Sequence, residues 1–135
     1  SDLPRRAILA DVRDADRIGR VFEEERPELV FHAAALKHVP MVELHPDEGA
    51  LTNVIGTKVV ADACCAHHTL AMVLISTDKA VNPSSMMGAT KRVAESYCQA
   101  LDLCEGARGD DRTHFVTVRT ALLSASLAYA AIRRR

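Results

Sequence analysis

The chain has 135 residues, of which 48% are hydrophobic and 26% are charged, and its formal net charge is −1. This composition is typical of one globular domain with its own core. The small net charge gives no electrostatic reason to expect a nucleic-acid partner or an acidic membrane surface. No apolar run approaches the ~20 residues that span a bilayer, and no signal segment is seen, so we expect a cytoplasmic chain.

Cysteine and histidine spacing gives no indication of a metal site. The cysteines form no C-x-x-C pair, and the histidines show no H-x-x-x-H spacing. Small apolar core residues in a reducing compartment are the simplest interpretation of the cysteines, which are Cys64, Cys65, Cys98 and Cys104.

The N-terminal third alternates short apolar runs with one amphipathic segment. Residues 7–10 predict a buried strand that ends at Asp11. Asp14 can cap a helix that Pro27 ends. A second strand is predicted over residues 29–34, followed by a loop through Pro40. The apolar side of the helix consists of Ala15, Ile18, Val21 and Phe22.

The rest of the chain continues the alternation. Pro46 suits the first turn of a second helix. Residues 72–75 predict a third strand, a third helix runs from about Met86 to Cys104, and residues 115–118 predict a fourth strand after a polar break. The second helix carries Leu51, Val54, Ile55, Val59 and Ala63 on one side, and the third is expected to bury Val93, Tyr97 and Leu101.

This β-α-β-α-β-α-β order predicts an α/β fold with a parallel sheet and helices on both faces. Right-handed crossovers bring the carboxyl ends of all strands to one edge, where such sheets bind ligands. Asp11, residues 32–34 and residues 76–78 fall at this edge. No G-x-G occurs, so we predict a partial Rossmann-like doubly wound sheet that lacks the first strand and its glycine-rich turn.

Several polar residues at this edge could carry chemistry. Residues 76–79 (STDK) combine a hydroxyl, a carboxyl and an amine that can act as proton donor, acceptor and anchor, although this sequence also makes a good loop. Lys91 could bind a ribose, although a solvated helix lysine is the simpler interpretation. Asn53 and Thr57 share a helix face and could support the site or form an ordinary polar stripe.

Four segments in order resemble a known family: HAAALKHVP (32–40), NVIGT (53–57), ISTDKAVNP (75–83) and MGATKR (87–92). They closely resemble the polysaccharide-biosynthesis (CapD-like) family of nucleotide-sugar 4,6-dehydratases and epimerases, within the extended short-chain dehydrogenase/reductase superfamily. The resemblance covers residues 7–119. It implies an NAD or NADP cofactor and a UDP-N-acetylhexosamine substrate.

The resemblance also implies a role for each matched position. Asp11 and Val12 are similar to the adenine-recognition corner, and Lys37 to a residue near the phosphates. Asn53 resembles a cofactor-side asparagine, and Lys91 a ribose-binding lysine. The small residues expected to let the backbone approach the cofactor are Ala33, Ala34 and Ala35, and those expected beside the nicotinamide and sugar are Ser76 and Thr77.

The implied reaction is dehydration of UDP-N-acetylglucosamine. A hydride leaves C4 of the sugar for the cofactor and returns to C6. Lys79 is expected to remove the C5 proton, and Asp78 to protonate the departing C6 hydroxyl. Met87 stands where the superfamily has a tyrosine and cannot transfer a proton, so Thr77 or Asp78 is expected to handle the O4 proton. The membrane-anchored members also carry Met here, so a longer, anchored parent is expected.

The family pattern stops after Arg119. We therefore expect residues 1–119 to form a partial NAD(P)-binding domain and residues 120–135 to be a divergent tail, either a frameshift product or a divergent helix. The whole chain is expected to be a fragment that is inactive alone, with activity in a longer parent that could be a homo-oligomer. A 4-epimerase and a non-catalytic remnant remain as alternatives, and self-association is expected if apolar sheet surface is exposed.

Overall fold

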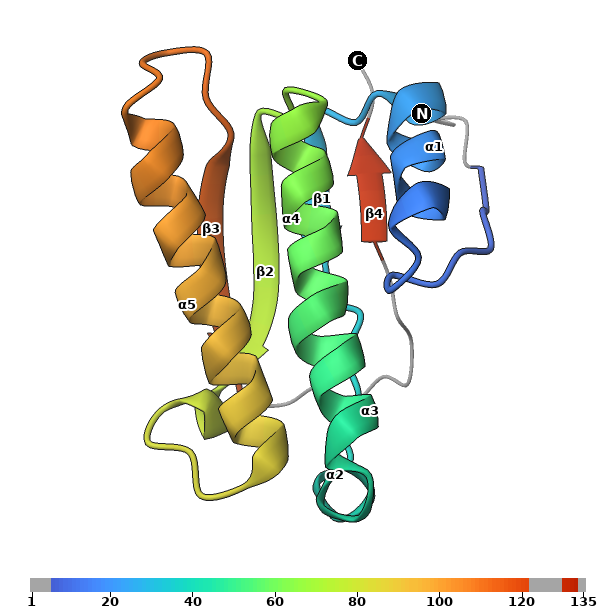
Figure 1. Ribbon diagram of the computed structural model, residues 1–135. Helices are drawn as coiled ribbons and strands as arrows, with labels where there is room; N and C mark the ends of the chain where they lie inside the picture. The colour runs from blue at the N-terminus through green and yellow to red at the C-terminus, as the bar shows by residue number, and fades with distance from the viewer. Residues whose placement is uncertain (1–5, 122–129, 134–135) are drawn as a thin grey trace.

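The computed structural model describes residues 6–121 and 130–133 and shows one sheet covered by helices (Figure 1). The sheet order is β3-β2-β1-β4. β1 (Leu29–His32), β2 (Ala71–Thr77) and β3 (His114–Thr120) are mutually parallel, whereas β4 (Ala130–Arg133) pairs antiparallel with β1. The expected α/β fold with a parallel, Rossmann-like sheet is confirmed.

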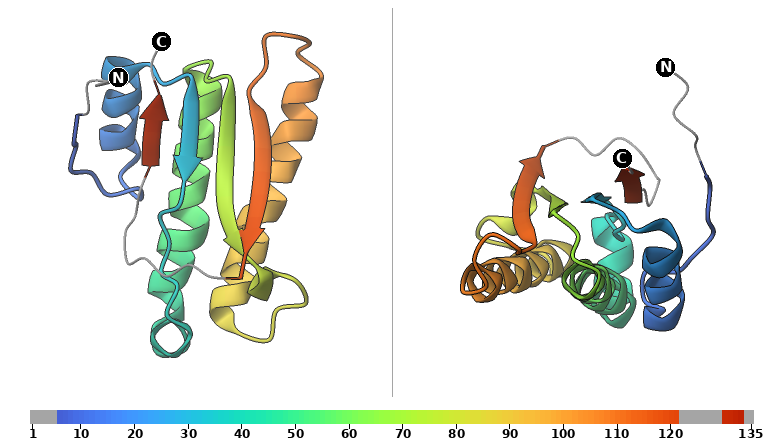
Figure 2. Two further views of the ribbon diagram at one scale, coloured as in Figure 1. Left: turned by 180° about the vertical axis from the view of Figure 1, so that it is seen from behind. Right: turned by 90° about the horizontal axis from the view of Figure 1, so that it is seen from above.

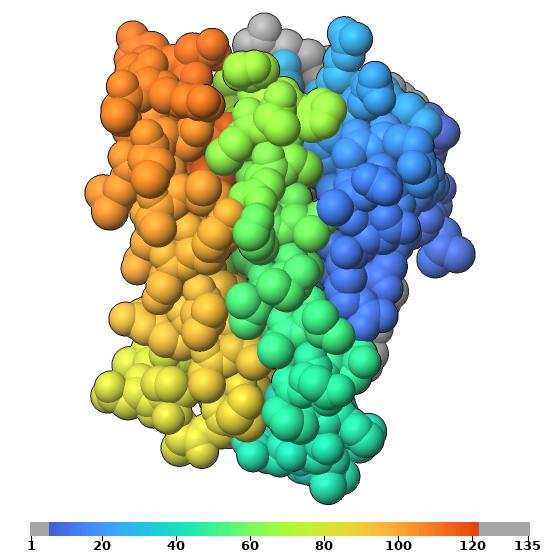
Figure 3. Space-filling model, viewed as in Figure 1, coloured from blue at the N-terminus to red at the C-terminus, as the bar shows by residue number. Residues whose placement is uncertain are grey.

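The helices lie on one face of this sheet, as the view from above shows (Figure 2). Figure 3 looks onto this side, where α1, α4 and α5 lie next to one another over the strands. The expectation of helices on both faces is therefore wrong for the described part of the chain. On the opposite face, Phe31, Val116 and Val118 are 42–50% exposed.

α1 (Ala15–Glu25) forms as predicted. The Asp14 carboxylate accepts a hydrogen bond from the Arg17 N–H at 2.9 Å, which satisfies one free donor of the first turn. Ile18 and Phe22 join the core between the helices and the sheet, together with Val30, Val60, Ala61, Cys64, Met72, Leu74, Ala94 and Cys98.

Residues 7–10 form no strand, and Leu9 is 95% exposed. A strand needs a hydrogen-bonded neighbour. The available edge of β1 pairs with β4 instead. The prediction was wrong because local apolar character does not supply this partner. The tail predicted over residues 120–135 thus contributes a strand to the sheet at residues 130–133 rather than a helix there.

The second predicted helix is a continuous helical segment built from three pieces. α3 (Pro46–Ala50) leads into a π-helical turn, η1 (Leu51–Ile55), and then into α4 (Gly56–Ala66). The wider π turn changes which side faces the sheet. Leu51 and Ile55, predicted on the apolar side, are therefore partly exposed, whereas Asn53 is fully buried.

A short helix, α2 (Val39–Leu44), occupies part of the predicted loop. Pro40 stands in its first turn, where a missing N–H has no consequence.

α5 (Met86–Gly106) begins after a Ser85 cap, close to the predicted start. Its inward side differs from the prediction because Val93 is 51% exposed. Tyr97 and Leu101 are only partly buried against the core. The buried side carries polar groups that have partners, including Lys91 and Glu95.

Candidate functional site

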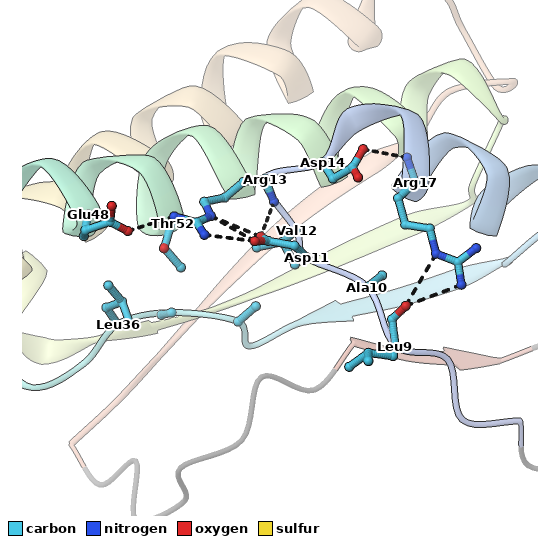
Figure 4. Close-up of a pocket in the computed structure, with 12 residues that line it drawn as sticks. Leu9, Ala10, Asp11, Val12, Arg13, Asp14, Arg17, Leu36, Glu48 and Thr52 are labelled. Carbon is cyan, nitrogen blue, oxygen red and sulfur yellow. Dashed lines mark hydrogen bonds and ion pairs between the residues drawn. The ribbon is translucent and has the colours of Figure 1, made fainter.

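An open cleft of about 700 Å³ lies between the loop that precedes α1 and the loop that follows β1 (Figure 4). It brings together four of the predicted cofactor residues: Asp11, Val12, Ala34 and Ala35. The other lining residues are Leu9, Ala10, Arg13, Asp14, Arg17, Leu36, Glu48 and Thr52. Ala33 and Lys37 lie on the same loop, outside this lining.

Arg13 joins the loop that precedes α1 to α3. Its guanidinium pairs with the Asp11 carboxylate at 3.0 Å and with Glu48 on α3 at 2.8 Å. Hydrogen bonds from the Arg13 side chain and backbone hold the pKa of Asp11 below its ordinary value. Asp11 is therefore an ionised acceptor at neutral pH, which suits hydrogen bonding to hydroxyl groups.

Asn53 fixes the loop that carries the small residues. Its Oδ1 accepts from the Leu36 N–H at 2.7 Å, and its Nδ2 donates to the Leu36 carbonyl at 3.0 Å and to the Thr90 hydroxyl at 2.9 Å. One fully buried amide thus ties the loop after β1 to the start of α5.

His32 adds a buried imidazole at the end of β1. The Thr57 hydroxyl donates to the Asn53 backbone carbonyl at 2.7 Å, so its oxygen accepts from Nε2 of His32 at 3.0 Å. This assigns the Nε2–H tautomer, and Nδ1 has no hydrogen-bond partner among the described residues. Burial, and secondarily the charge of Lys91, lower the pKa of His32 to about 3, so the ring is neutral.

The predicted catalytic residues form one cluster at the end of β2. Thr77 is buried, and its hydroxyl donates to Oδ1 of Asp78 at 3.1 Å and accepts from the Lys79 N–H at 3.3 Å. The ammonium of Lys79 lies 3.9 Å from the Asp78 carboxylate. Both charged side chains are more than half exposed, so they can reach a bound molecule at this edge.

Lys91 lies behind this cluster rather than in it. The residue is 2% exposed, and its Nζ donates to the Ile75 carbonyl at 2.8 Å. Burial lowers the pKa of Lys91 to about 8, while the charge of Glu95 acts in the opposite direction. Ser76 is fully buried nearby; its hydroxyl lies close to the Glu95 carboxylate without a hydrogen bond of normal geometry.

The start of α5 packs directly onto the cluster. Met87 is buried. A Cβ on Gly88 would lie 2.3 Å from the Lys79 carbonyl oxygen. Only a glycine at position 88 therefore lets α5 approach the loop that carries Asp78 and Lys79.

The sequence reasoning assigned no role to His32, Thr90 or Glu95. Glu95 could have been found because it lies one helical turn after Lys91. His32 and Thr90 gave no such signal, since their partners come from distant parts of the chain.

The described residues contain no group of His, Cys, Asp and Glu side chains able to hold a metal ion, and the four cysteines are free. No helix in the described ranges is both long and apolar enough to cross a membrane.

Similar proteins point to one family. The capsular polysaccharide biosynthesis protein CapD of Staphylococcus aureus is 46% identical over 83% of this chain and 18% of its own length. The inverting UDP-N-acetylglucosamine 4,6-dehydratase of Campylobacter jejuni is 36% identical over 84% of this chain and 33% of its own. A UDP-glucose 4-epimerase of Thermus thermophilus, solved with NAD, superposes with a TM-score of 0.74 at 25% identity, covering 82% of this chain and 39% of that one.

The chain thus spans 18% and 33% of the two curated relatives' lengths. Residues 2–126 match the family described as polysaccharide biosynthesis protein. With most of its length matched, this chain belongs to that family.

Proposed function

We propose that the chain is the central part of an NAD-dependent UDP-N-acetylglucosamine 4,6-dehydratase-like enzyme of polysaccharide or glycan biosynthesis. The main support for this proposal is the Asp78–Lys79 pair, a carboxylate and an amine 3.9 Å apart at the carboxyl end of β2. Dehydration needs an acid and a base on neighbouring carbons of the sugar, and this pair supplies both.

The residues around the cleft fit a dinucleotide cofactor. Asp11 offers an ionised acceptor, and Ala34 and Ala35 leave room for close approach along the loop that Asn53 fixes. The same proposal includes the other expected cofactor contacts. Ala33 would let the backbone approach the cofactor, Lys37 would lie near the phosphates, Ser76 beside the nicotinamide and Lys91 at the ribose. When bound, a nicotinamide supplies reversible acceptance of a hydride.

In the proposed reaction Lys79 first releases its ammonium proton to solvent and then, as a neutral amine, takes the C5 proton once C4 is a ketone. Asp78, protonated by the O4 proton that the Thr77 hydroxyl passes on, gives that proton to the C6 oxygen, and the C6–O bond breaks with loss of water. The Thr77 hydroxyl already donates to Asp78, so it orients that carboxyl and lies ready to pass on the O4 proton. Met87 cannot take part in proton transfer.

A second candidate is a nucleotide-sugar 4-epimerase, because a UDP-glucose 4-epimerase structure superposes on most of the chain. Simple epimerisation at C4 needs no base at C5, so the Asp78–Lys79 pair favours dehydration. A third candidate concerns the 135 residues alone, which span a small part of the relatives and can be non-catalytic without the remainder.

Solvent isotope exchange tests the role of Lys79 in a complete parent enzyme. Lys79→Ala should stop exchange of the sugar C5 proton with deuterium oxide while leaving nucleotide-sugar binding intact. Lys58→Ala, at an exposed lysine of α4, is the control and should exchange normally. Normal exchange in Lys79→Ala contradicts the proposal.

Calorimetry tests the cofactor on the 135-residue chain itself. We expect NAD to bind more tightly when UDP-N-acetylglucosamine is present, because the two ligands would meet at the carboxyl end of β2. A folded chain that binds no NAD would make the third candidate, a non-catalytic piece, the better description.

A further inference from the structure

A carboxylate that the proposed reaction does not use lies fully buried beside the candidate site. Glu95 on α5 has no exposed side-chain area. Arg119 at the end of β3 binds it with two hydrogen bonds, Nε to Oε1 at 3.1 Å and Nη2 to Oε2 at 2.7 Å. Arg92 adds a longer contact at 3.4 Å. Burial opposes ionisation most strongly, but these bonds together hold the pKa of Glu95 below its ordinary value.

Glu95 follows Lys91 by one helical turn, so both side chains leave the same face of α5. Lys91 is buried, with a backbone carbonyl as its hydrogen-bond acceptor. A neutral carbonyl compensates only part of the cost of burying an ammonium group. The buried carboxylate one turn away is therefore the natural source of the remaining stabilisation.

The other groups around Lys91 do not provide a negative charge. His32 on β1 is neutral, so it does not stabilise the positive charge of Lys91. Burial raises the pKa of the Cys98 thiol to about 12, so it too is neutral at physiological pH. Ser76 on β2 carries only a hydroxyl. Arg92 and Arg119 are positive and act through their contacts with Glu95.

We infer that Glu95 is a positioning residue that keeps Lys91 protonated for hydrogen bonding to a bound nucleotide, and that Arg119 limits how strongly Lys91 feels this carboxylate. The role of Lys91 in binding a nucleotide rests on the proposed function, whereas the coupling between Glu95 and Lys91 is independent of it.

The coupling matters because the pKa of Lys91 lies close to physiological pH. With a pKa of about 8, Lys91 is mostly charged at pH 7 but close to losing its proton. A tenfold loss of proton affinity would leave most molecules uncharged slightly above neutrality. Glu95 thereby sets the upper pH limit of any binding that needs the ammonium group.

Side-chain NMR of the full 135-residue chain with labelled lysine tests this directly, because there are only four lysines: Lys37, Lys58, Lys79 and Lys91. Lys91→Arg assigns the resonance of interest. We expect a wild-type midpoint near pH 8. Glu95→Gln should lower the proton affinity of Lys91 about tenfold, because an opposite charge nearby is lost.

Two further variants separate charge from loosened packing. Arg119→Gln should move the Lys91 midpoint upward, because the carboxylate loses its own positive partner. Glu105→Gln should leave it unchanged. Glu105 is also a buried α5 carboxylate paired with an arginine, but it lies 14 positions from Lys91, about 21 Å along the helix. An unchanged midpoint in folded Glu95→Gln, or a fall in both Glu95→Gln and Arg119→Gln, overturns the inference.

NAD binding measured against pH supplies the functional arm. Its alkaline limit should shift with the Lys91 midpoint, downward in Glu95→Gln and upward in Arg119→Gln. If the midpoints move and binding does not follow, the coupling stands and the proposed nucleotide role of Lys91 is overturned.

Discussion

The side-chain amide of Asn53 binds both backbone hydrogen-bonding groups of Leu36, with Oδ1 2.7 Å from the nitrogen and Nδ2 3.0 Å from the carbonyl oxygen. The same Nδ2 also donates to the Thr90 hydroxyl. A single residue on the π turn thus determines the path of the loop after β1, whose Leu36 lines the cleft (Figure 4).

Replacing Asn53 with leucine should therefore destabilise the fold. The isosteric side chain leaves the Leu36 N–H and carbonyl without partners, which costs about 2–4 kcal/mol in the free energy of unfolding. Urea denaturation measures this, and Gln99→Leu, at an exposed amide of α5, is the control expected to change little. If Asn53→Leu lost no more free energy of unfolding than Gln99→Leu, the role assigned to the amide would be wrong.

Gly88→Ala tests the contact between α5 and the loop after β2. The new Cβ would meet the Lys79 carbonyl at 2.3 Å, so α5 or the loop must move. We expect a loss of about 1–3 kcal/mol in the free energy of unfolding, the range for overpacking, and a displaced Asp78–Lys79 pair with weaker turnover in a complete parent.

The matched control is Gly19→Ala in α1, where nothing lies within 4 Å of the added Cβ. Removing a helix-interior glycine there should stabilise the chain by about 0.5–1 kcal/mol. If both alanine variants changed stability in the same direction, the steric explanation for Gly88 would be wrong.

Acid should destabilise the chain through His32. Its pKa is about 3 in the folded chain and about 6.5 when unfolded, so between these values the unfolded state binds more protons. Stability therefore falls as the pH falls from 7 towards 3, by about 2 kcal/mol between pH 7 and pH 5 from this residue alone.

Urea unfolding of His32→Gln at both pH values isolates this effect. The variant can be less stable than the wild type at each pH. The difference between its free energies of unfolding at pH 7 and pH 5 should be about 2 kcal/mol smaller than that of the wild type. His68→Gln, at an exposed histidine, should retain the wild-type difference. An undiminished pH difference in His32→Gln would rule out a buried neutral ring.

The sequence was informative where a structure depends on neighbours in the chain. Asp14 caps α1, and Ile18 and Phe22 enter the core, because capping and helical spacing are local properties. The strand-end rule likewise located Thr77 and Asp78, since parallel strands bring their carboxyl ends to one edge.

Long-range pairing explains what could not be predicted. Val93 was expected in the core by hydrophobicity, yet α5 turns Lys91 and Glu95 inward because Ile75 and Arg119 supply their partners. Residues 7–10 have a strand-like sequence but no neighbouring strand. The part played by His32 depends on Thr57, which lies 25 residues away.

The apolar sheet face opposite the helices should make the isolated chain self-associate. Phe31, Val116 and Val118 expose 42–50% of their area there, and contiguous apolar surface of this kind is buried by association. Replacing both Val116 and Val118 with threonine keeps the β-branched shape that suits a strand but adds polar groups. Sedimentation velocity over a concentration series should then show a shift from larger species towards the monomer.

The control for this experiment is Val93→Thr, which changes an equally exposed valine on the helical side. It should associate like the wild type, because the helices present a mixed surface rather than a continuous apolar one. If Val93→Thr reduced association as much as the double variant, the contact would lie on the helices. A wild-type chain that remained monomeric at every concentration would show that the exposed strand face is tolerated in water, and that burial of this face is not what drives assembly.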